Sequence, residues 1–483
     1  MKHNIYKIAF AGLLGGLLLS SCNDFLDVRP KSEKVQNDLF SSSKGFEDAI
    51  NGVYGSLQMS TLYGRDLLWG VNEVLAQNLQ CTSTTMTAMS IYDYTNDYVK
   101  QELSSIWTSA YQTIGYANNV LEQLGDKSNG MTYYNLYKGE MLGVRAMLHF
   151  DMLRLFAPTD TTKTGIPYST SYSKTVNPFL TVGEDYRRII ADLKEAESLL
   201  SEDTELMAYP RNNSHYDKFA NYRETHCNLY AVQALLARVY WMKGDMAQAG
   251  EYAEKVISSG KFPLAEPTEV QDYLAGRLSP KETVFGVYSS TYLETCKNYL
   301  YTYQSYVSYN PYYDGSGSKH LLPYDALYNL DVEGTAQDYR RNHFVASGAY
   351  ATFLKLVDYY LLEENGSEPD TRVNDITGVT LIHSSELYLI AAEAFLQTDY
   401  AKAVSYFDAE RTSRGLPKLT AEQKLTQDMI YNEYHKELYG EGQFWYNMKR
   451  LNKPIVSNAQ SKTIPASDNI YVLPIPDEEY QYR

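Results

Sequence analysis

Residues 229–257 read LYAVQALLARVYWMKGDMAQAGEYAEKVI, and this stretch decides the fold class. Its apolar residues recur every three or four positions on both sides of one interruption, Lys243-Gly244-Asp245. Such spacing is typical of amphipathic helices, and a glycine between two periodic segments is typical of a tight turn. The stretch therefore predicts a helix, a turn and a second helix, whose apolar positions are Leu229, Val232, Leu236, Val239, Tyr240, Ala249, Ala253, Val256 and Ile257.

A second copy of this pattern lies nearer the C-terminus. It begins with ELYLIAAEA at residues 386–394 and continues past Asp399. Small side chains at a helix crossing let two backbones approach closely. Alanines occur at matching positions in the two copies. Aligning Asp399 with Asp245 also aligns two pairs of alanines, Ala391 with Ala237 and Ala403 with Ala249. The two units resemble tetratricopeptide-type hairpins, which stack on one another to bury a continuous core.

The N-terminus has the pattern of an export signal. Lys2 and Lys7 precede an apolar run over residues 8–19, which is too short to span a bilayer comfortably. The run ends Leu-Ser-Ser-Cys at residues 19–22. This ending resembles a bacterial lipobox, which implies cleavage after residue 21 and acylation of Cys22, including a palmitate-type chain. The alternative to a lipoprotein signal is a short apolar segment that precedes a buried cysteine by chance.

Composition excludes some partners and leaves others open. The formal net charge of −16 over 483 residues repels phosphate backbones and anionic lipid, so we expect neither nucleic acid nor electrostatic membrane docking. Tyrosine is in excess, with 46 residues against 4 tryptophans, and its flat ring with a hydroxyl suits sugars, peptides and wet interfaces equally. Cys81, Cys227 and Cys296 are expected to be buried free thiols.

Helical periodicity recurs over residues 107–124 and 144–156, whereas residues 262–380 are expected to be rich in loops. The central region carries a tyrosine cluster between residues 299 and 313. The alternation of Tyr299, Tyr301 and Tyr303 leaves open a short half-buried strand. Spacing typical of zinc or calcium sites is missing from the sequence, so we expect no bound metal and no cofactor.

Three segments together resemble the SusD/RagB family of nutrient-binding lipoproteins. The first is the lipobox with Cys-Asn-Asp-Phe-Leu-Asp at residues 22–27 and Pro30, and the second is the helical repeat at residues 234–249. The third comprises Arg-Gly-Leu at residues 414–416, Glu-Leu at 437–438, Glu-Gly-Gln at 441–443, Lys-Arg at 449–450 and Leu-Pro-Ile-Pro at 473–476. His383 and His435 depart from the family pattern, which commonly has arginine at both positions.

This resemblance implies a mostly all-α fold of four tetratricopeptide-like hairpins with an irregular, loop-rich ligand-facing lobe. It implies residues 1–21 as signal peptide, 22–261 as the N-terminal SusD-like region, 262–380 as the ligand-facing region and 381–483 as the C-terminal region. It also implies a lid over a SusC-like TonB-dependent transporter. The protein would then be anchored in the cell outer membrane through lipid and would face the exterior.

Ligand contacts in this family follow no transferable motif, so candidates come from residue chemistry. Stacking of an aromatic face on a sugar ring buries C–H surface. The tyrosines in the two segments where family members tend to build the ligand face are the candidates, namely Tyr92, Tyr94, Tyr301, Tyr303, Tyr306, Tyr309, Tyr312 and Tyr313.

Four hypotheses follow for the function. The first is capture of oligosaccharide for uptake, and its alternatives are peptide capture, a channel-gating subunit with little ligand binding of its own, and a surface glycoside hydrolase. The last is the weakest, because the sequence lacks nucleophile-elbow, P-loop and dinucleotide motifs. We expect no catalytic residues, and we interpret Glu437, Glu441, Lys449 and Arg450 as structural ion-pairing residues.

Overall fold

The computed structural model describes residues 38–81, 83–125, 127–128, 130–270, 278–302, 307–308, 312–313, 319–320, 327–328, 337–347, 350–356, 376–457, 460 and 462–481. The chain divides into two units, residues 1–49 and 50–483. In the first unit, the rings of Phe40 and Phe46 contact each other with centroids 4.9 Å apart. Helix α3 (Ser43–Leu57) begins in the first unit and ends in the second.

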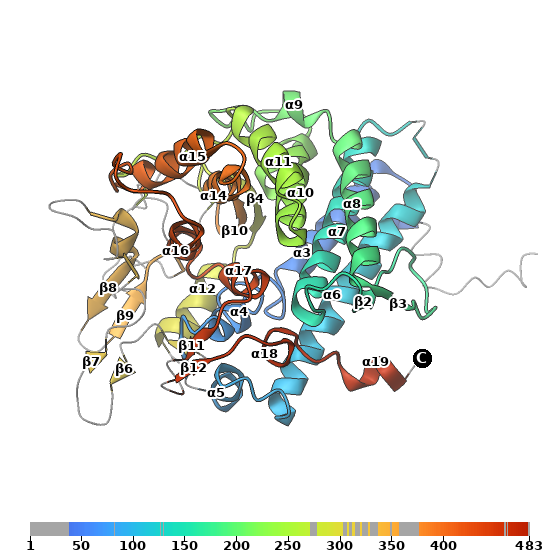
Figure 1. The fold of residues 1–483 in the computed structure, drawn as a ribbon. Coiled ribbons are helices and arrows are strands. Elements are labelled where there is room, and N and C mark those ends of the chain that lie inside the picture. The colour runs from blue at the N-terminus through green and yellow to red at the C-terminus, as the bar shows by residue number, and fades with distance from the viewer. Residues whose placement is uncertain are drawn as a thin grey trace, which may run out of the picture. The chain divides into compact units, whose positions relative to one another are not determined.

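The second unit is dominated by helices (Figure 1). The long ones are α6 (Asp97–Leu124), α7 (Tyr134–Phe156), α8 (Val182–Leu199), α10 (Leu229–Lys243), α11 (Met246–Ser258), α14 (Ser384–Phe395), α15 (Tyr400–Ser413) and α16 (Gln427–Glu437). Each packs beside the next in an array, since α7 contacts α6 and α8, α10 contacts α8 and α11, and α14 contacts α11, α15 and α16. This arrangement confirms the expected mostly all-α fold.

The two predicted hairpins are α10–α11 and α14–α15. Gly244 ends α10 with a φ of 88°, a left-handed conformation that glycine adopts without steric cost. The next residue, Asp245, accepts a hydrogen bond from the backbone N–H of Gln248 and caps α11, and Asp399 caps α15 through Lys402 in the same way. The four aligned alanines are fully buried, namely Ala237, Ala249, Ala391 and Ala403.

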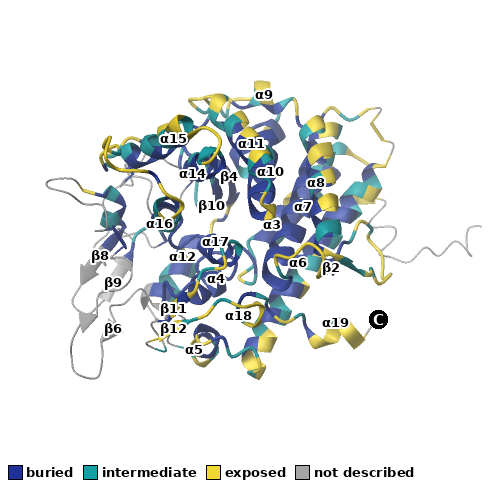
Figure 2. Ribbon diagram, in the orientation of Figure 1, coloured by how far each residue is buried: buried dark blue, intermediate teal, exposed yellow. Residues whose placement is uncertain are grey.

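Burial follows the array of helices (Figure 2). Helix α7 is buried on nearly every residue from Gly139 to Phe156, because α6 and α8 cover it on both sides. Its sequence accordingly shows apolar residues all round rather than a single stripe, as expected for a helix in the centre of a large core. Helix α8 instead exposes one polar face to solvent.

Shorter helical segments connect these elements. They are α4 (Val71–Leu75), α5 (Thr84–Ser90), α9 (Asp203–Leu206), η1 (Lys218–Ala220), η2 (Arg223–Thr225), α12 (Tyr292–Lys297), η3 (Asn298–Thr302), η4 (Tyr339–His343), α17 (Phe444–Arg450), α18 (Asp468–Tyr471) and α19 (Asp477–Gln481). Because η3 is a π-helical turn, Tyr299 and Tyr301 do not form the short strand that their alternation left open. The turn continues directly from α12, which extends the helical path past Tyr301.

The strands of the described residues form two-stranded antiparallel ladders. The pairs are β1 (Gln80–Cys81) with β5 (Val307–Ser308), β2 (Thr164–Pro167) with β3 (Phe179–Thr181), β4 (Thr283–Tyr288) with β10 (Gly378–His383), β6 (Tyr312–Tyr313) with β7 (Lys319–His320), β8 (Phe344–Ser347) with β9 (Tyr350–Phe353), and β11 (Ile455–Ser457) with β12 (Lys462–Ile464). Five of the strands lie between residues 300 and 360, within the region expected to be rich in loops.

The three cysteines of the described residues are free thiols. Cys227 and Cys296 are buried as expected, whereas Cys81 is half-buried because it lies in the short strand β1. Across the described parts of the chain, no helix is long and apolar enough to cross a membrane.

Candidate functional site

The two segments predicted to hold ligand are brought together by one strand pair. Strand β1 pairs with β5 so that Gln80 lies opposite Ser308 and Cys81 opposite Val307. The segment around Tyr92 therefore joins the segment around Tyr301 across more than 200 residues of sequence. The structure describes the backbone of Tyr301, Tyr312 and Tyr313. Tyr303, Tyr306, Tyr309 and Cys22 lie outside the described residues.

Tyr92 and Tyr94 make their contacts inside the protein. Tyr92 is 7% exposed, its hydroxyl donates to the Leu75 carbonyl at 2.8 Å, and its ring stacks on Trp445. Burial raises the pKa of this hydroxyl far above its ordinary value. The Tyr94 hydroxyl donates to the Ile470 carbonyl at 2.8 Å. The Tyr92 hydroxyl thus ties the chain after α5 to α4, whereas the Tyr94 hydroxyl ties it to the C-terminal segment at Ile470.

Tyr299 belongs to the tyrosine cluster and is half-buried. Its ring centroid lies 6.3 Å from that of Trp69, and the Arg65 guanidinium lies 5.6 Å from the same ring. Arg65 is in turn held by Asp66 at 2.7 Å and Glu102 at 2.6 Å. Aromatic faces attract such cations, so these contacts orient the start of the cluster.

A cavity of about 490 Å³ opens where α3, η2 and β4 meet. Tyr222 and Tyr288 line it and remain about half exposed, at 48% and 52%. Its polar lining consists of Asn51, Gln58, Thr225 and His226. The sequence alone does not point to this cavity, because its lining residues come from four distant segments, around residues 51–58, 222–226, 287–288 and 376.

A buried ionic network lies beneath this cavity. The Arg223 guanidinium bonds Glu140 at 2.5 Å and Asp203 at 2.7 Å, and His226 Nδ1 lies 3.0 Å from Glu140 Oε2. The Tyr54 hydroxyl donates to the same carboxylate at 2.7 Å. Burial raises the pKa of Glu140, but the neighbouring Arg223 and His226 lower it to about 2. Glu140 is therefore an anion that fixes both walls of the cavity.

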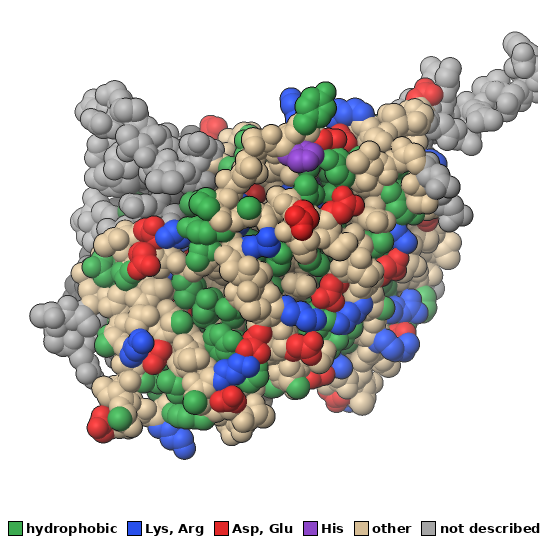
Figure 3. Space-filling model, turned by 90° about the horizontal axis from the view of Figure 1, so that it is seen from above, with side chains coloured by type: hydrophobic (Ala, Val, Ile, Leu, Met, Phe, Trp, Pro, Cys, Tyr) green, Lys and Arg blue, Asp and Glu red, His purple; other side chains and the backbone are tan. Residues whose placement is uncertain are grey.

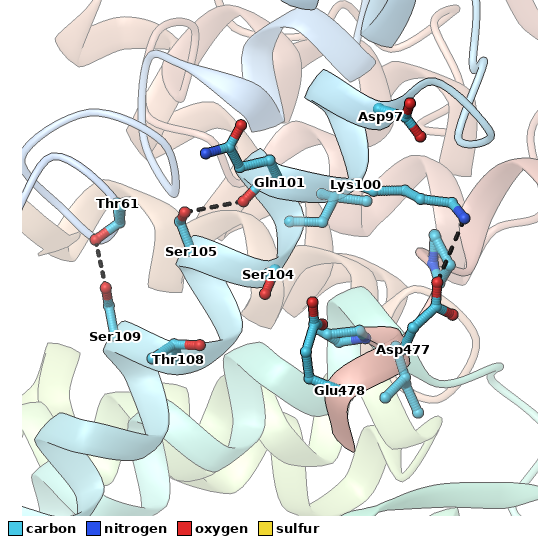
Figure 4. A pocket seen from close by; sticks show the side chains of 14 residues that line it. Thr61, Asp97, Lys100, Gln101, Ser104, Ser105, Thr108, Ser109, Asp477 and Glu478 are labelled. Atoms are coloured by element: carbon cyan, nitrogen blue, oxygen red, sulfur yellow. Dashed lines mark hydrogen bonds and ion pairs between the residues drawn. The ribbon is translucent and has the colours of Figure 1, made fainter. Parts of the chain in front are cut away.

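A second hollow of about 570 Å³ lies between the first half of α6 and residues 474–478 (Figure 4). Its lining is rich in hydroxyls, and the side chains of Ser104 and Glu478 point into the space between the two segments. Lys100 Nζ reaches Asp477 at 3.4 Å across the groove. Thr61 donates to Ser109 at 2.7 Å at one end. The lining contains no aromatic ring, so this groove offers hydrogen bonds without a stacking platform.

The charged motif residues near the C-terminus are structural, as predicted. Arg414 bonds Glu437 with two nitrogens at 2.8 and 2.6 Å, and it also bonds Glu282. Arg340 bonds the same Glu437 at 3.0 Å. Burial raises the pKa of Glu437, but Arg414 and Arg340 lower it well below its ordinary value. This carboxylate stays charged and paired, which leaves it unsuited to exchange protons with a substrate.

The remaining motif residues have the same role. Lys449 donates to the carbonyls of Arg154 and Ala157 at 2.6 Å each, and Arg450 bonds Glu393 at 2.7 Å. Glu441 pairs with His383 at 3.2 Å and with Lys355. These contacts join segments that are distant in sequence.

The two histidines that depart from the family pattern each make a specific contact. His383 keeps an ion pair with Glu441, and this carboxylate raises the pKa of the imidazole against the lowering effect of burial. His435 stacks on Phe444 with ring centroids 3.6 Å apart, and its Nε2 lies 2.8 Å from Asn78 Oδ1. His383 thus preserves a local ion pair, whereas His435 replaces charge with ring stacking.

The described residues contain no group of three or more His, Cys, Asp or Glu side chains placed to hold a metal ion. On the face seen in Figure 3, acidic and basic side chains are interleaved over the described surface. Stacked helical hairpins with cavities open at the surface define a helical-repeat protein.

Comparison with known proteins identifies the family. Residues 24–241 match a family model described as starch-binding and associating with the outer membrane, and residues 354–481 match the SusD family model. The chain belongs to the SusD/RagB family. A relative, SusD-like protein P2 of Formosa agariphila, is 25% identical, and the match covers 98% of this chain and 97% of that protein. SusD-like protein P38 of the same organism is 21% identical, over 94% of this chain and 93% of the relative.

Solved structures show the same fold. A SusD superfamily protein from Bacteroides thetaiotaomicron has a TM-score of 0.71 at 23% identity, covering 91% of this chain and 97% of that one. A laminarin-binding SusD-like protein has a TM-score of 0.63 at 18% identity, with coverages of 91% and 98%. Surface glycan-binding protein A from Bacteroides fluxus has a TM-score of 0.63 at 19% identity, with coverages of 91% and 97%.

Proposed function

We propose that the protein is a non-catalytic, cell-surface lipoprotein that captures oligosaccharides and passes them to a SusC-like TonB-dependent transporter in the outer membrane. The observation that carries this proposal is the family match over residues 24–241, whose description joins starch binding with the outer membrane. The names of two solved relatives, one binding laminarin and one a surface glycan-binding protein, support the same ligand class.

The chemistry of the chain is consistent with a capture role. A lid must bind reversibly, and aromatic faces with neutral hydrogen-bonding groups give contacts of modest strength that add along an oligomer. The proposal keeps the tyrosines of the central segment as ligand contacts, namely Tyr301, Tyr303, Tyr306, Tyr309, Tyr312 and Tyr313.

A parallel binding screen tests the ligand class. The chain from residue 23 would be offered starch, laminarin, mannan, xylan, alginate and a peptide digest, and binding would be followed by affinity gel and calorimetry. We expect binding to one glycan class, weakened by Tyr312→Ala with Tyr313→Ala. Tyr216→Ala is the matched control, because this tyrosine is fully exposed and far along the chain from the cluster. Binding of the digest alone would instead support peptide capture.

The transporter partnership has a separate test. We expect an affinity-tagged form, expressed in its native outer membrane and extracted in mild detergent, to co-purify with a large β-barrel transporter. Recovery of the protein alone, with ligand binding intact, would contradict the partnership but not the capture role. A stable complex without measurable ligand binding would support the channel-gating alternative.

A further inference from the structure

Two tyrosine rings from different elements open onto the cavity between α3, η2 and β4. Tyr222 precedes η2 and Tyr288 ends β4, and both rings are about half exposed. Because both tyrosines line the same cavity, each offers exposed ring surface that a ligand in the cavity would cover. The two faces border one cavity of about 490 Å³, a size typical of small-ligand sites.

The backbone holds both rings in place. Tyr222 has a φ of 53°, a left-handed conformation that tyrosine rarely adopts, and its N–H donates to the Asn213 side chain at 2.8 Å. Its carbonyl accepts from the Thr225 N–H at 2.8 Å. Arg223, the next residue, is anchored by Glu140 and Asp203. Strained backbone of this kind persists where the surrounding structure fixes it, commonly at ligand-binding sites.

Tyr288 is fixed from the other side of the cavity. It pairs with Gly378 at the end of the β4–β10 ladder. A Cβ at Gly378 would lie 2.2 Å from the Val287 carbonyl oxygen, so only glycine allows the two strands to approach so closely there. The backbone of Tyr288 is therefore held in place by this ladder.

The other polar groups of the cavity are neutral donors and acceptors. Asn51 and Gln58 each offer an amide with both functions, and Thr225 offers a hydroxyl. This set matches the vicinal hydroxyls of a sugar, which also donate and accept. Asn51 lies on α3 and Gln58 directly follows it, whereas Tyr222 precedes η2 and Tyr288 ends β4, so hydrogen bonds and stacking would come from different elements.

The charge of the lining selects the kind of sugar. Among the described residues that line this cavity, there is no Asp, Glu, Lys or Arg, and the Nδ1 atom of His226 faces the buried Glu140. From these residues a uronate, a sulfated sugar or a charged peptide would gain no counter-charge to offset its lost hydration. The groove beside α6 differs, since Asp97, Lys100 and Asp477 line it.

We propose that this cavity is a binding site for an uncharged pyranose ring of the captured oligosaccharide, held by stacking on Tyr222 and Tyr288. The inference rests on the proposed glycan-binding function and adds to it a location and a ligand class. It is separate from the tyrosine cluster that sequence analysis identified.

Calorimetry on the full mature chain tests the site with the neutral glycan that it binds most tightly among starch, laminarin, mannan and xylan oligosaccharides. Tyr288→Ala and Tyr222→Gly are the test variants, and glycine suits the left-handed backbone at residue 222. We expect each to lower the association constant about tenfold, the loss of one stacked ring. Tyr222→Phe, which keeps the ring, and Tyr216→Ala, six residues away and fully exposed, should bind as the native chain does.

The outcomes separate this inference from the wider function. If both test variants unfold at the native temperature and bind the glycan with native affinity, the proposed site is wrong. Glycan capture by the protein would not be contradicted. Binding of alginate oligomers but of no neutral glycan would also overturn the site and leave capture standing. Binding of no glycan at all would overturn both. If Tyr288→Ala unfolds, Tyr222→Gly alone decides the question.

Discussion

His149 shows how single buried residues of this protein depend on their protonation state. It lies in the middle of α7 and is fully buried. Its Nε2 atom accepts from the Ser169 backbone N–H at 3.0 Å, and its Nδ1 atom lies 2.9 Å from the Arg145 carbonyl. Because a backbone N–H can only donate, Nε2 carries no proton and Nδ1 donates to the carbonyl. The ring is therefore neutral, and burial lowers its pKa to about 3.

This neutral histidine predicts acid sensitivity. Above the unfolded pKa of about 6.5, neither state binds the proton, whereas between about 6.5 and 3 only the unfolded chain does. The free energy of unfolding should therefore fall by about 1.4 kcal/mol per pH unit as pH decreases through this window. His149→Gln, which can accept from Ser169 and donate to Arg145, should remove this part of the slope. Urea unfolding of both forms between pH 7 and 4 measures it, and identical slopes would contradict the assignment.

At the scale of single residues, sequence analysis identified charges better than ligand contacts. Glu437, Glu441, Lys449 and Arg450 have the predicted structural role, but their partners are distant in sequence rather than three or four positions along a helix. The exposure of Tyr288 follows instead from its neighbours in space. Its aromatic chemistry is visible in the sequence, but nothing in the sequence separates it from the other 45 tyrosines.

At the scale of elements, the two hairpins share one capping arrangement. Asp245 and Asp399 each accept from the backbone N–H three residues later, at 3.3 and 3.1 Å. We expect Asp245→Ala and Asp399→Ala each to lower the free energy of unfolding by about 1 kcal/mol, because each leaves a helix N–H without its partner. Asp245→Asn keeps a hydrogen-bond acceptor and should lower the free energy of unfolding by only a few tenths of this amount. Chemical denaturation measures all three, and equal losses in the Ala and Asn variants would show that charge rather than capping matters.

The helices could be predicted from sequence because the 3.6-residue spacing of their apolar residues is local, and α6, α10, α11 and α14 follow it, whereas α7 is buried on all sides. The conformation of the segment after α12 could not be predicted in this way. Alternating tyrosines at residues 299–303 fit a strand, yet contacts of Tyr299 with Trp69 and Arg65 accompany a π-helical turn there. Short segments follow their tertiary contacts rather than their pattern, since few local hydrogen bonds oppose the change.

At the scale of the whole molecule, buried charge joins distant parts of the chain. Arg414 of the segment after α15 bonds Glu282, which precedes β4, and Glu437 of α16, while Arg340 of η4 bonds Glu437 as well. Removing one member of such a network leaves the others buried and unpaired. The charged residues of the Arg-Gly-Leu and Glu-Leu motifs therefore serve to hold distant segments of the fold together. The Tyr222–Tyr288 cavity is the opposite case, since α3, η2 and β4 meet only after folding.

Attachment to the membrane is the last property of the whole molecule, and under the proposed function it depends on Cys22. The net charge of −16 repels anionic lipid, so in the proposed lipoprotein acyl chains on Cys22 would supply the attraction. We expect Cys22→Ser to abolish palmitate labelling and move the protein from the membrane pellet to the supernatant. Cys81→Ser, which changes a half-buried free thiol, should leave both unchanged. Cys22→Ser protein that still sediments with membranes after a salt wash would show that another segment, or the transporter, holds it there.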